Sequence, residues 1–160
     1  MSFINRSLDT LAPWNTVILT KDVINNNSSA NTIADVTGLS FVVESGGLYQ
    51  FEFVIPFSAA ATTTGSRWAI NGPATPSLLV YSSEYSLTST TSTRNANVIA
   101  YDSPASASAT SGDTVHNMAY IFGLIQPSTT GTVIARFASE VSSSAITAKA
   151  GAVLRWARLR

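Results

Sequence analysis

The chain has 160 residues, with 9 basic and 9 acidic side chains, a formal net charge of zero and a hydrophobic content of 45%. A disordered chain combines low hydrophobicity with high net charge, so this composition predicts one folded domain of ordinary size. The absence of cysteine excludes disulfides, thiolate nucleophiles and cysteine-bound metal centres. The polarity of the chain comes mainly from the hydroxyl groups of 23 serines and 19 threonines. Because the net charge is zero, little electrostatic repulsion keeps copies of the protein apart.

The first residues, MSFINRSLDTLAP, are interpreted as an N-terminal arm (1–13) ahead of a single domain over 14–160. The arm lacks the basic and apolar regions of a secretory signal peptide. No run of 18 apolar residues occurs anywhere in the chain, so neither a transmembrane helix nor a membrane partner is expected. The apolar side chains of the arm are candidate contacts with a neighbouring protein: Phe3, Ile4, Leu8 and Leu11.

From residue 14 onward, β-branched and aromatic runs alternate with clusters of Gly, Pro, Asn and Ser, a pattern typical of all-β proteins. The first expected strand is WNTVILT (14–20), and a polar loop follows over 24–32. The next strand, IADVTGLSFVV (33–43), contains Gly38, where a bulge or bend is expected. The sequence ESGG (44–47) favours a tight hairpin, because glycine adopts positive φ without strain.

The clearest strand pattern is YQFEFVI (49–55). Successive side chains of a strand point to opposite faces, so four large apolar residues share one face. They are Tyr49, Phe51, Phe53 and Ile55. This stripe requires an opposing layer, whereas the other face is mixed. Pro56 has no N–H group and is expected to stop the pairing near its position.

Further strands are expected over 67–70, 77–83, 97–103, 115–126, 132–140 and 152–159. Two Ser/Thr-rich stretches, 86–95 and 103–113, are expected to be loops. The resulting count of eight or nine strands predicts an all-β, antiparallel two-sheet sandwich of the jelly-roll type.

No group of residues predicts catalysis, a cofactor or a metal site, and the protein is expected not to be an enzyme. The single histidine, His116, is expected to begin a strand, half exposed, with Asp113 nearby. The GxSxG elbow and the glycine-rich phosphate-binding motifs are absent. The acidic residues are scattered, so nothing points to a glycosidase-type carboxylate pair.

Four of the nine basic residues lie in the last twelve positions, KAGAVLRWARLR. Nucleic-acid binding requires an extended basic surface with stacking aromatic rings, and one tryptophan between two arginines is a weak match, so nucleic acid is an unlikely partner. The favoured interpretation is a terminal strand with Leu154 and Trp156 on one face and Arg155 on the opposite face. An alternative is a cationic edge that docks on an acidic partner, which makes candidate interface residues of Arg155, Arg158 and Arg160.

Trp68 follows the small-residue stretch ATTTGSR and is a candidate ligand-binding residue. An exposed tryptophan among hydroxyl-rich loops is a plausible platform for a sugar ring. The alternative, which is favoured, places Trp68 in the core with the loops merely capping the sandwich.

Two segments resemble tailed-bacteriophage virion proteins. The first is TIADVTGLSFVVESGGLYQFEFVIPFSAAATTTGSRWAINGP (32–73), and the second, AITAKAGAVLRWARLR (145–160), is similar to the closing strand of such chains. The pattern GLYQFEF (47–53) also resembles the C1q/TNF-like jelly roll, a fold that usually trimerises.

The resemblance implies a non-enzymatic structural protein of the virion, assembled in the host cytoplasm. It further implies a homo-oligomer, with a trimer favoured, and contacts with the major capsid protein or other virion proteins. One placement is a decoration or cement protein on the outer head surface. The other is a tail-fibre or receptor-binding head domain that recognises a host glycan or surface protein. Only about thirteen residues precede the first expected strand, which favours decoration.

Overall fold

The computed structural model describes residues 13–104 and 110–160, so the predicted arm contacts Phe3, Ile4, Leu8 and Leu11 lie outside the described residues. The described residues form strands and no helix. The strands are β1 (Asn15–Ile18), β2 (Val23–Asn25), β3 (Ala34–Val43), β4 (Tyr49–Ala59), β5 (Ser66–Asn71), β6 (Leu78–Ser86), β7 (Ser92–Val98), β8 (Asn117–Gln126), β9 (Gly131–Ser139), β10 (Ile146–Ala148) and β11 (Val153–Arg158).

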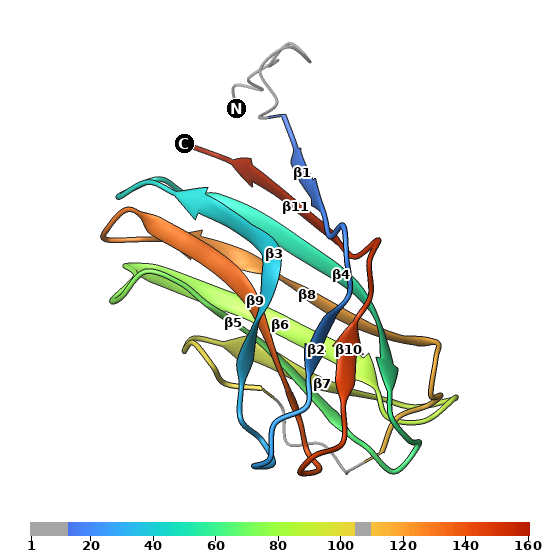
Figure 1. Cartoon of the computed structure of the whole chain (residues 1–160). Coiled ribbons are helices and arrows are strands. Elements are labelled where there is room, and N and C mark those ends of the chain that lie inside the picture. The colour runs from blue at the N-terminus through green and yellow to red at the C-terminus, as the bar shows by residue number, and fades with distance from the viewer. Residues whose placement is uncertain (1–12, 105–109) are drawn as a thin grey trace.

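The strands form two antiparallel sheets that face each other (Figure 1). The larger sheet has the order β1-β11-β4-β8-β6-β7, and β10 joins it between β4 and β2. The smaller sheet has the order β3-β9-β5. The predicted all-β two-sheet sandwich is therefore confirmed.

Strand pairing is nested, with early strands paired to late ones. β1 pairs with β11, β2 with β10, β3 with β9 and β4 with β8. Such nesting brings the first and last strands together and is the arrangement of a jelly roll. β6 and β7 extend the larger sheet beyond β8.

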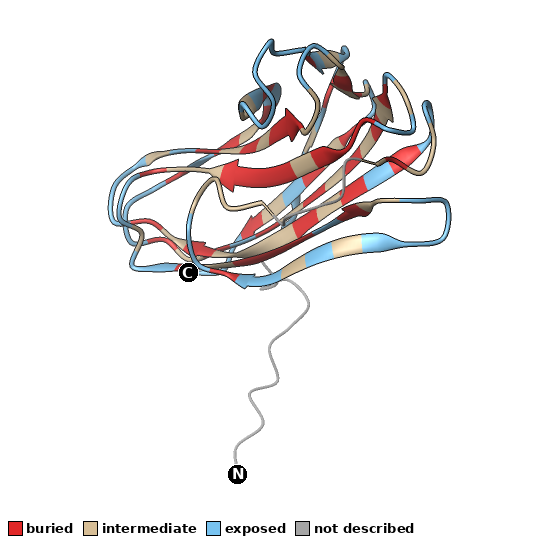
Figure 2. Cartoon of the chain, turned by 90° about the horizontal axis from the view of Figure 1, so that it is seen from below, coloured by how far each residue is buried: buried red, intermediate tan, exposed pale blue. Residues whose placement is uncertain are grey.

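The core lies between the two sheets, where the buried positions of both layers meet (Figure 2). The predicted stripe on β4 is confirmed, because each of its four side chains is at most 4% exposed. Phe41 of β3 lies 6.1 Å from Phe51 between ring centroids and stacks on Trp156 of β11 at 5.2 Å. These aromatic contacts join the smaller sheet to the larger one.

Gly123 of β8 permits a close approach of the neighbouring strand β6. A Cβ atom at Gly123 would lie 2.4 Å from the carbonyl oxygen of Val80 and 2.5 Å from the Cβ of Tyr81. Both distances are too short for non-bonded atoms, so β6 and its large tyrosine pack over a position that only glycine can occupy.

Residues 13–104 and 110–160 form eleven strands, where eight or nine were expected for the chain. Two of the additional strands, β2 and β10, have three residues each. β7 occupies 92–98, although 86–95 was predicted as a loop and 97–103 as a strand. β7 is the edge strand of the larger sheet and pairs with β6. An edge strand can form from mainly polar residues, because much of it is exposed. The chain leaves the sheet after Val98 and takes positive φ at Asp102.

The turn over 44–47 does not form the predicted hairpin. The turn itself is present, with Gly46 at φ 77° and the Gly47 N–H donating to the Glu44 carbonyl. β3 and β4 nevertheless belong to different sheets, so the turn carries the chain from one layer to the other. The predicted bend at Gly38 is confirmed by its φ of 96° and by a register shift in the pairing of β3 with β9.

Pro56 does not stop the pairing, because β4 continues to Ala59. On one side of β4, however, the partner changes near this proline. β11 pairs with residues 49–54 and β10 with residues 57–59, which leaves 55–56 between the two partners. The missing N–H of Pro56 therefore coincides with an interruption in the neighbouring strand.

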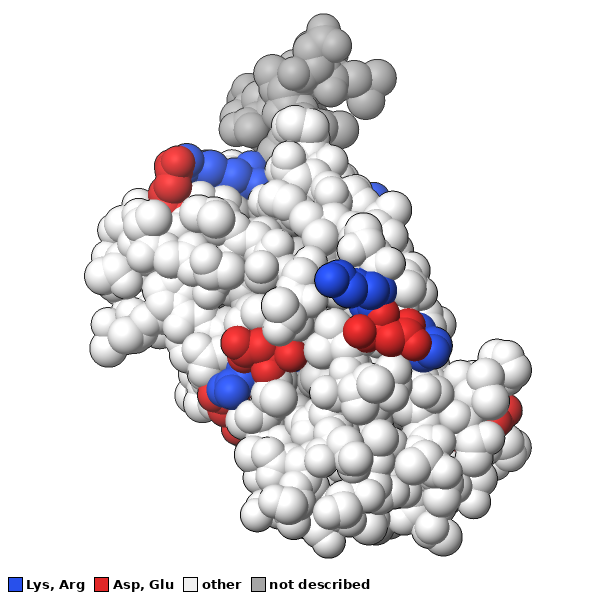
Figure 3. Space-filling model, viewed as in Figure 1, with Lys and Arg blue, Asp and Glu red and all other residues white. Residues whose placement is uncertain are grey.

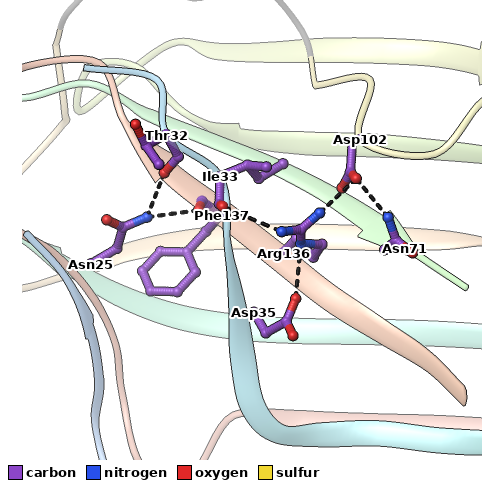
Figure 4. Close-up of polar contacts among 8 residues, drawn as sticks. All are labelled: Asn25, Thr32, Ile33, Asp35, Asn71, Asp102, Arg136 and Phe137. Carbon is purple, nitrogen blue, oxygen red and sulfur yellow. Dashed lines mark hydrogen bonds and ion pairs between the residues drawn. The ribbon is translucent and has the colours of Figure 1, made fainter. Parts of the chain in front are cut away.

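An ionic network fixes the segment after β7 on the outer face of the smaller sheet (Figure 4). Arg136 of β9 forms ion pairs with Asp35 at 2.8 Å and with Asp102 at 2.6 Å. Asn71 of β5 donates to the same Asp102 carboxylate at 2.6 Å. The backbone N–H of Asp102 donates to the Ile70 carbonyl, so Asp102 is held through both its side chain and its main chain.

Many of the charges on the surface are paired with a neighbouring opposite charge. On the face shown in Figure 3, basic and acidic side chains lie beside one another in small groups, and most of the remaining surface is uncharged. The ion pairs Arg67–Glu140 and Lys149–Asp22 are examples of such neighbouring opposite charges. The zero net charge thus reflects local pairing as well as an overall balance.

Candidate functional site

Trp68 lies in the core, and the prediction that it binds a ligand is wrong. Its side chain is 0% exposed, and its ring stacks on Phe137 with 5.1 Å between centroids and an interplanar angle of 15°. Phe57 covers another side at 5.1 Å, and the indole N–H donates to Ser66 Oγ at 2.9 Å. A ring enclosed in this way cannot serve as a platform for a sugar, so the core alternative is correct.

The three C-terminal arginines do not form a free cationic edge. Arg155 pairs with Glu52 at 3.0 Å and lies over the Trp14 ring, with its guanidinium carbon 5.0 Å from the centroid. Arg158 pairs with Glu44. Arg160 donates to the amide oxygen of Gln126 at 3.2 Å. Two of the three charges are therefore already compensated within the chain, which reduces the attraction to an acidic partner.

His116 lies immediately before β8, which begins at Asn117, and not within the strand as predicted. Its side chain is 83% exposed, where half exposure was expected. Its Nδ1 is 3.4 Å from Asp113 Oδ2. Within residues 13–104 and 110–160, no group of three or more His, Asp or Glu side chains is placed to hold a metal ion. In the same described ranges there is also no helix long and apolar enough to cross a membrane.

The structure reveals a surface that the sequence interpretation did not single out. On the outer side of the larger sheet, neighbouring strands carry half-buried apolar side chains that face away from the core. We call this surface the outer aromatic face and define it by Val54, Val80, Tyr120, Phe122 and Leu124. The strand register places these residues side by side, since Tyr120 is opposite Val54 and Leu124 is opposite Val80.

The centre of this face is an aromatic pair. The rings of Tyr120 and Phe122 lie 5.0 Å apart between centroids. The Tyr120 hydroxyl donates to Glu52 at 3.2 Å, and Glu52 also pairs with Arg155, so the tyrosine is held in place. Partial burial, followed by the nearby Glu52 charge, raises the pKa of Tyr120.

Two shallow hollows flank Phe122. One, of about 300 Å³, is bordered by Gln50 and Glu52, and the other, of about 310 Å³, by Val80 and Arg94. Phe122 therefore stands as a ridge between two depressions. A ridge between depressions can interlock with side chains of a second protein surface.

The rim of the face carries charges of both signs. Glu84 of β6 and Arg94 of β7 are direct cross-strand neighbours. Glu84 accepts a hydrogen bond from Ser92, and no ion pair joins Glu84 to Arg94 within the described part of the chain. Both charges can therefore pair with groups outside the protein.

The sequence does contain the signal for this face. In NMAYIFGLIQ (117–126), one alternating set is Ala119, Ile121 and Ile125, and the other is Met118, Tyr120 and Phe122. A strand that is apolar in both sets is typical of one buried on both faces. Because only one face of β8 meets the smaller sheet, the other face has no covering layer among the residues that the structure describes.

No protein-family model matches the chain, and no curated protein matches it. A solved structure described as "Structure of infectious bursal disease virus Gx strain" is similar over 99% of this chain, with 10% sequence identity and a TM-score of 0.31. The chain covers 45% of the length of that viral chain. At this identity and TM-score, the likeness carries no argument about function.

Proposed function

We propose that this protein is a non-enzymatic structural protein of a tailed-phage particle, a decoration or cement protein that binds the outer head surface. The observation that carries this proposal is the outer aromatic face. Contiguous apolar patches on folded domains commonly mark contacts with other proteins, and aromatic residues are enriched in such contacts. A rigid sheet that presents Tyr120 and Phe122 suits permanent packing in a shell.

The same face supports a homo-oligomer. A chain with zero net charge experiences little repulsion between copies. The rim offers one acidic group, Glu84, and one basic group, Arg94, so a second copy can meet either with the opposite charge. The preference for a trimer rests on the resemblance to C1q/TNF-like jelly rolls.

Replacing the ridge residue tests the role of the face in assembly. Phe122→Ser removes a large half-buried apolar side chain from the outer side of the sheet and leaves the inter-sheet core intact. Sedimentation velocity is expected to show an oligomer for the wild type and a monomer for Phe122→Ser. Ile99→Ser, at an exposed position outside the face, is the matched control and is expected to remain oligomeric.

Two results would contradict this role: a monomeric wild type, or an oligomer that survives Phe122→Ser. Circular dichroism of each variant separates loss of assembly from loss of folding.

Mixing purified protein with bare mature phage capsids tests the placement on the head. The protein is expected to co-sediment with the capsids up to a fixed number of copies per particle. Absence of binding to capsids, together with binding to host cells, would replace decoration with the second candidate function.

That second candidate is a tail-fibre or receptor-binding head domain. It is favoured by the hydroxyl-rich loops that gather at one end of the sandwich (Figure 1). The loops over 26–32, 60–65 and 140–145 contact one another there through backbone hydrogen bonds from Ser143 to Asn27 and from Ala60 to Ala145. Hydroxyl groups can exchange hydrogen bonds with a glycan on a host surface.

A further inference from the structure

A polar hollow lies where the connection between β6 and β7 meets the loop before β8. Its volume is about 230 Å³, and its lining includes Ser86, Thr88, Asp113, His116 and Asn117. Hydroxyl, carboxylate, imidazole and amide groups thus surround one depression. Together they provide both donors and acceptors of hydrogen bonds.

The hollow continues onto an apolar surface. An adjoining depression of about 290 Å³ shares Ser86, His116 and Asn117 with the polar hollow. Its remaining lining includes Pro56, Val115 and Met118. Val115 and Met118 are both exposed, so a ligand in the polar part can also cover apolar atoms.

The segment that forms the polar wall, residues 111–117, is firmly held. Buried Ser111 donates from its hydroxyl to the Thr64 carbonyl at 2.6 Å. Buried Asn117 accepts from the Asp113 N–H at 3.0 Å and donates to the Asp113 carbonyl at 2.5 Å. A Cβ atom at Gly112 would lie 2.7 Å from the Thr88 carbonyl oxygen, so only glycine allows the two loops to approach this closely.

Two side chains on this fixed backbone remain accessible. The side chains of His116 and Asp113 are 83% and 46% exposed, respectively. The Val115 N–H donates to the Asp113 carboxylate and lowers its pKa, and the ionised carboxylate has further lone pairs that can accept hydrogen bonds. A held backbone with accessible polar groups loses little conformational freedom when a ligand binds.

We propose that this hollow binds a neutral saccharide ring. Asp113 accepts hydrogen bonds from the ring hydroxyls, and His116 and Ser86 exchange further hydrogen bonds with them. The C–H face of the ring packs on Met118 and Val115. An anionic ligand fits less well, because the Asp113 carboxylate would repel it. This inference goes beyond the proposed structural role and does not depend on it.

Nuclear magnetic resonance can test the site directly, because the chain has one histidine and two methionines. The His116 ring and the Met118 methyl group therefore give signals that are easily assigned. The probes are the methyl glycosides of glucose, galactose, N-acetylglucosamine and rhamnose, added separately at millimolar concentrations to the full chain. At least one glycoside is expected to shift both signals in a saturable way and to leave the Met1 methyl signal unchanged. If no glycoside shifts them, the inference is overturned.

A matched pair of variants tests which groups bind. Asp113→Asn keeps an oxygen that can accept from the Val115 N–H but removes the charge, and it is expected to weaken glycoside binding at least tenfold. Glu44→Gln changes an exposed carboxylate that pairs with Arg158, away from the hollow, and is expected to leave binding unchanged. Equal affinity in both variants would overturn the assignment of Asp113. Sedimentation of Phe122→Ser tests assembly and does not depend on glycoside binding. The proposed structural role and the proposed saccharide site can therefore fail independently of each other.

Discussion

The Phe51 ring shows what a single side chain contributes between the two sheets. It is 1% exposed and lies 6.1 Å from Phe41 and 5.9 Å from Phe53 between ring centroids. Removing a buried aromatic ring costs its transfer free energy and leaves a cavity. Phe51→Ala is therefore expected to lower the free energy of unfolding by about 3–5 kcal/mol in urea titrations.

Gln50 is the control, because it is the exposed neighbour on the same strand. Gln50→Ala is expected to change the free energy of unfolding by less than about 1 kcal/mol. Similar losses for the two variants would mean that the two faces of β4 have been assigned incorrectly.

Tyr81 is expected to lower the stability of the folded protein at alkaline pH. Its ring is buried, its hydroxyl donates to the Ala100 carbonyl at 3.1 Å, and burial raises its pKa from 10.0 to about 12. In the unfolded chain the phenol ionises near its ordinary pKa, so between these two values the unfolded state binds fewer protons than the folded state. The free energy of unfolding must then fall as pH rises from about 10 to about 12.

Urea midpoints measured across this pH range check the expectation. Tyr81→Phe is expected to be less stable at neutral pH, because it loses a hydrogen bond, and to lose less stability on going to alkali. A pH dependence identical to that of the wild type would show that Tyr81 does not contribute. Tyr101, whose pKa burial also raises to about 12, accounts for part of the remaining dependence.

Residue types alone could not decide where Trp68 points. The strand RWAI is short, and its tryptophan, alanine and isoleucine are all buried, so simple alternation gives no direction. By contrast, the 49–55 stripe could be predicted with its correct face, because large rings recur there at every second position. Long alternating patterns determine a face, and short apolar ones do not.

At the level of elements, the Arg136 network is expected to hold the segment after β7 on the smaller sheet. The Arg136 side chain is 20% exposed, and removing it leaves the Asp102 carboxylate without its cationic partner. Arg136→Met is expected to lower the free energy of unfolding by about 1–3 kcal/mol. It is also expected to speed hydrogen exchange at the Asp102 amide, which bonds to the Ile70 carbonyl.

Arg94→Met is the matched control, since Arg94 forms no ion pair with any described residue. It is expected to leave hydrogen exchange at the Asp102 amide unchanged, because Arg94 does not contact Asp102. Unaltered exchange at Asp102 in Arg136→Met would mean that backbone contacts alone hold the segment.

Several element boundaries were beyond sequence reasoning for a physical reason. β7 consists largely of polar residues, and it forms because β6 offers an open edge. The turn at 44–47 has the residues of a hairpin, yet the partners of β3 and β4 are distant strands. Local chemistry specifies a turn, whereas the sheet that each strand joins depends on tertiary pairing. The outer aromatic face was missed for a related reason, because a strand apolar on both sides does not reveal which side is covered.

At the level of the whole molecule, the proposed assembly couples stability to protein concentration. If copies pack through the outer aromatic face, unfolding must also separate them, and mass action makes the thermal midpoint rise with concentration. The wild type is expected to show this rise in calorimetric scans over a hundredfold range of concentration. Phe122→Ser is expected to show a constant midpoint, because the variant retains the inter-sheet core and loses the ridge between the two hollows. A midpoint independent of concentration in the wild type, with an oligomer absent at all concentrations, would leave Tyr120 and Phe122 facing solvent and would remove the basis for the proposed structural role.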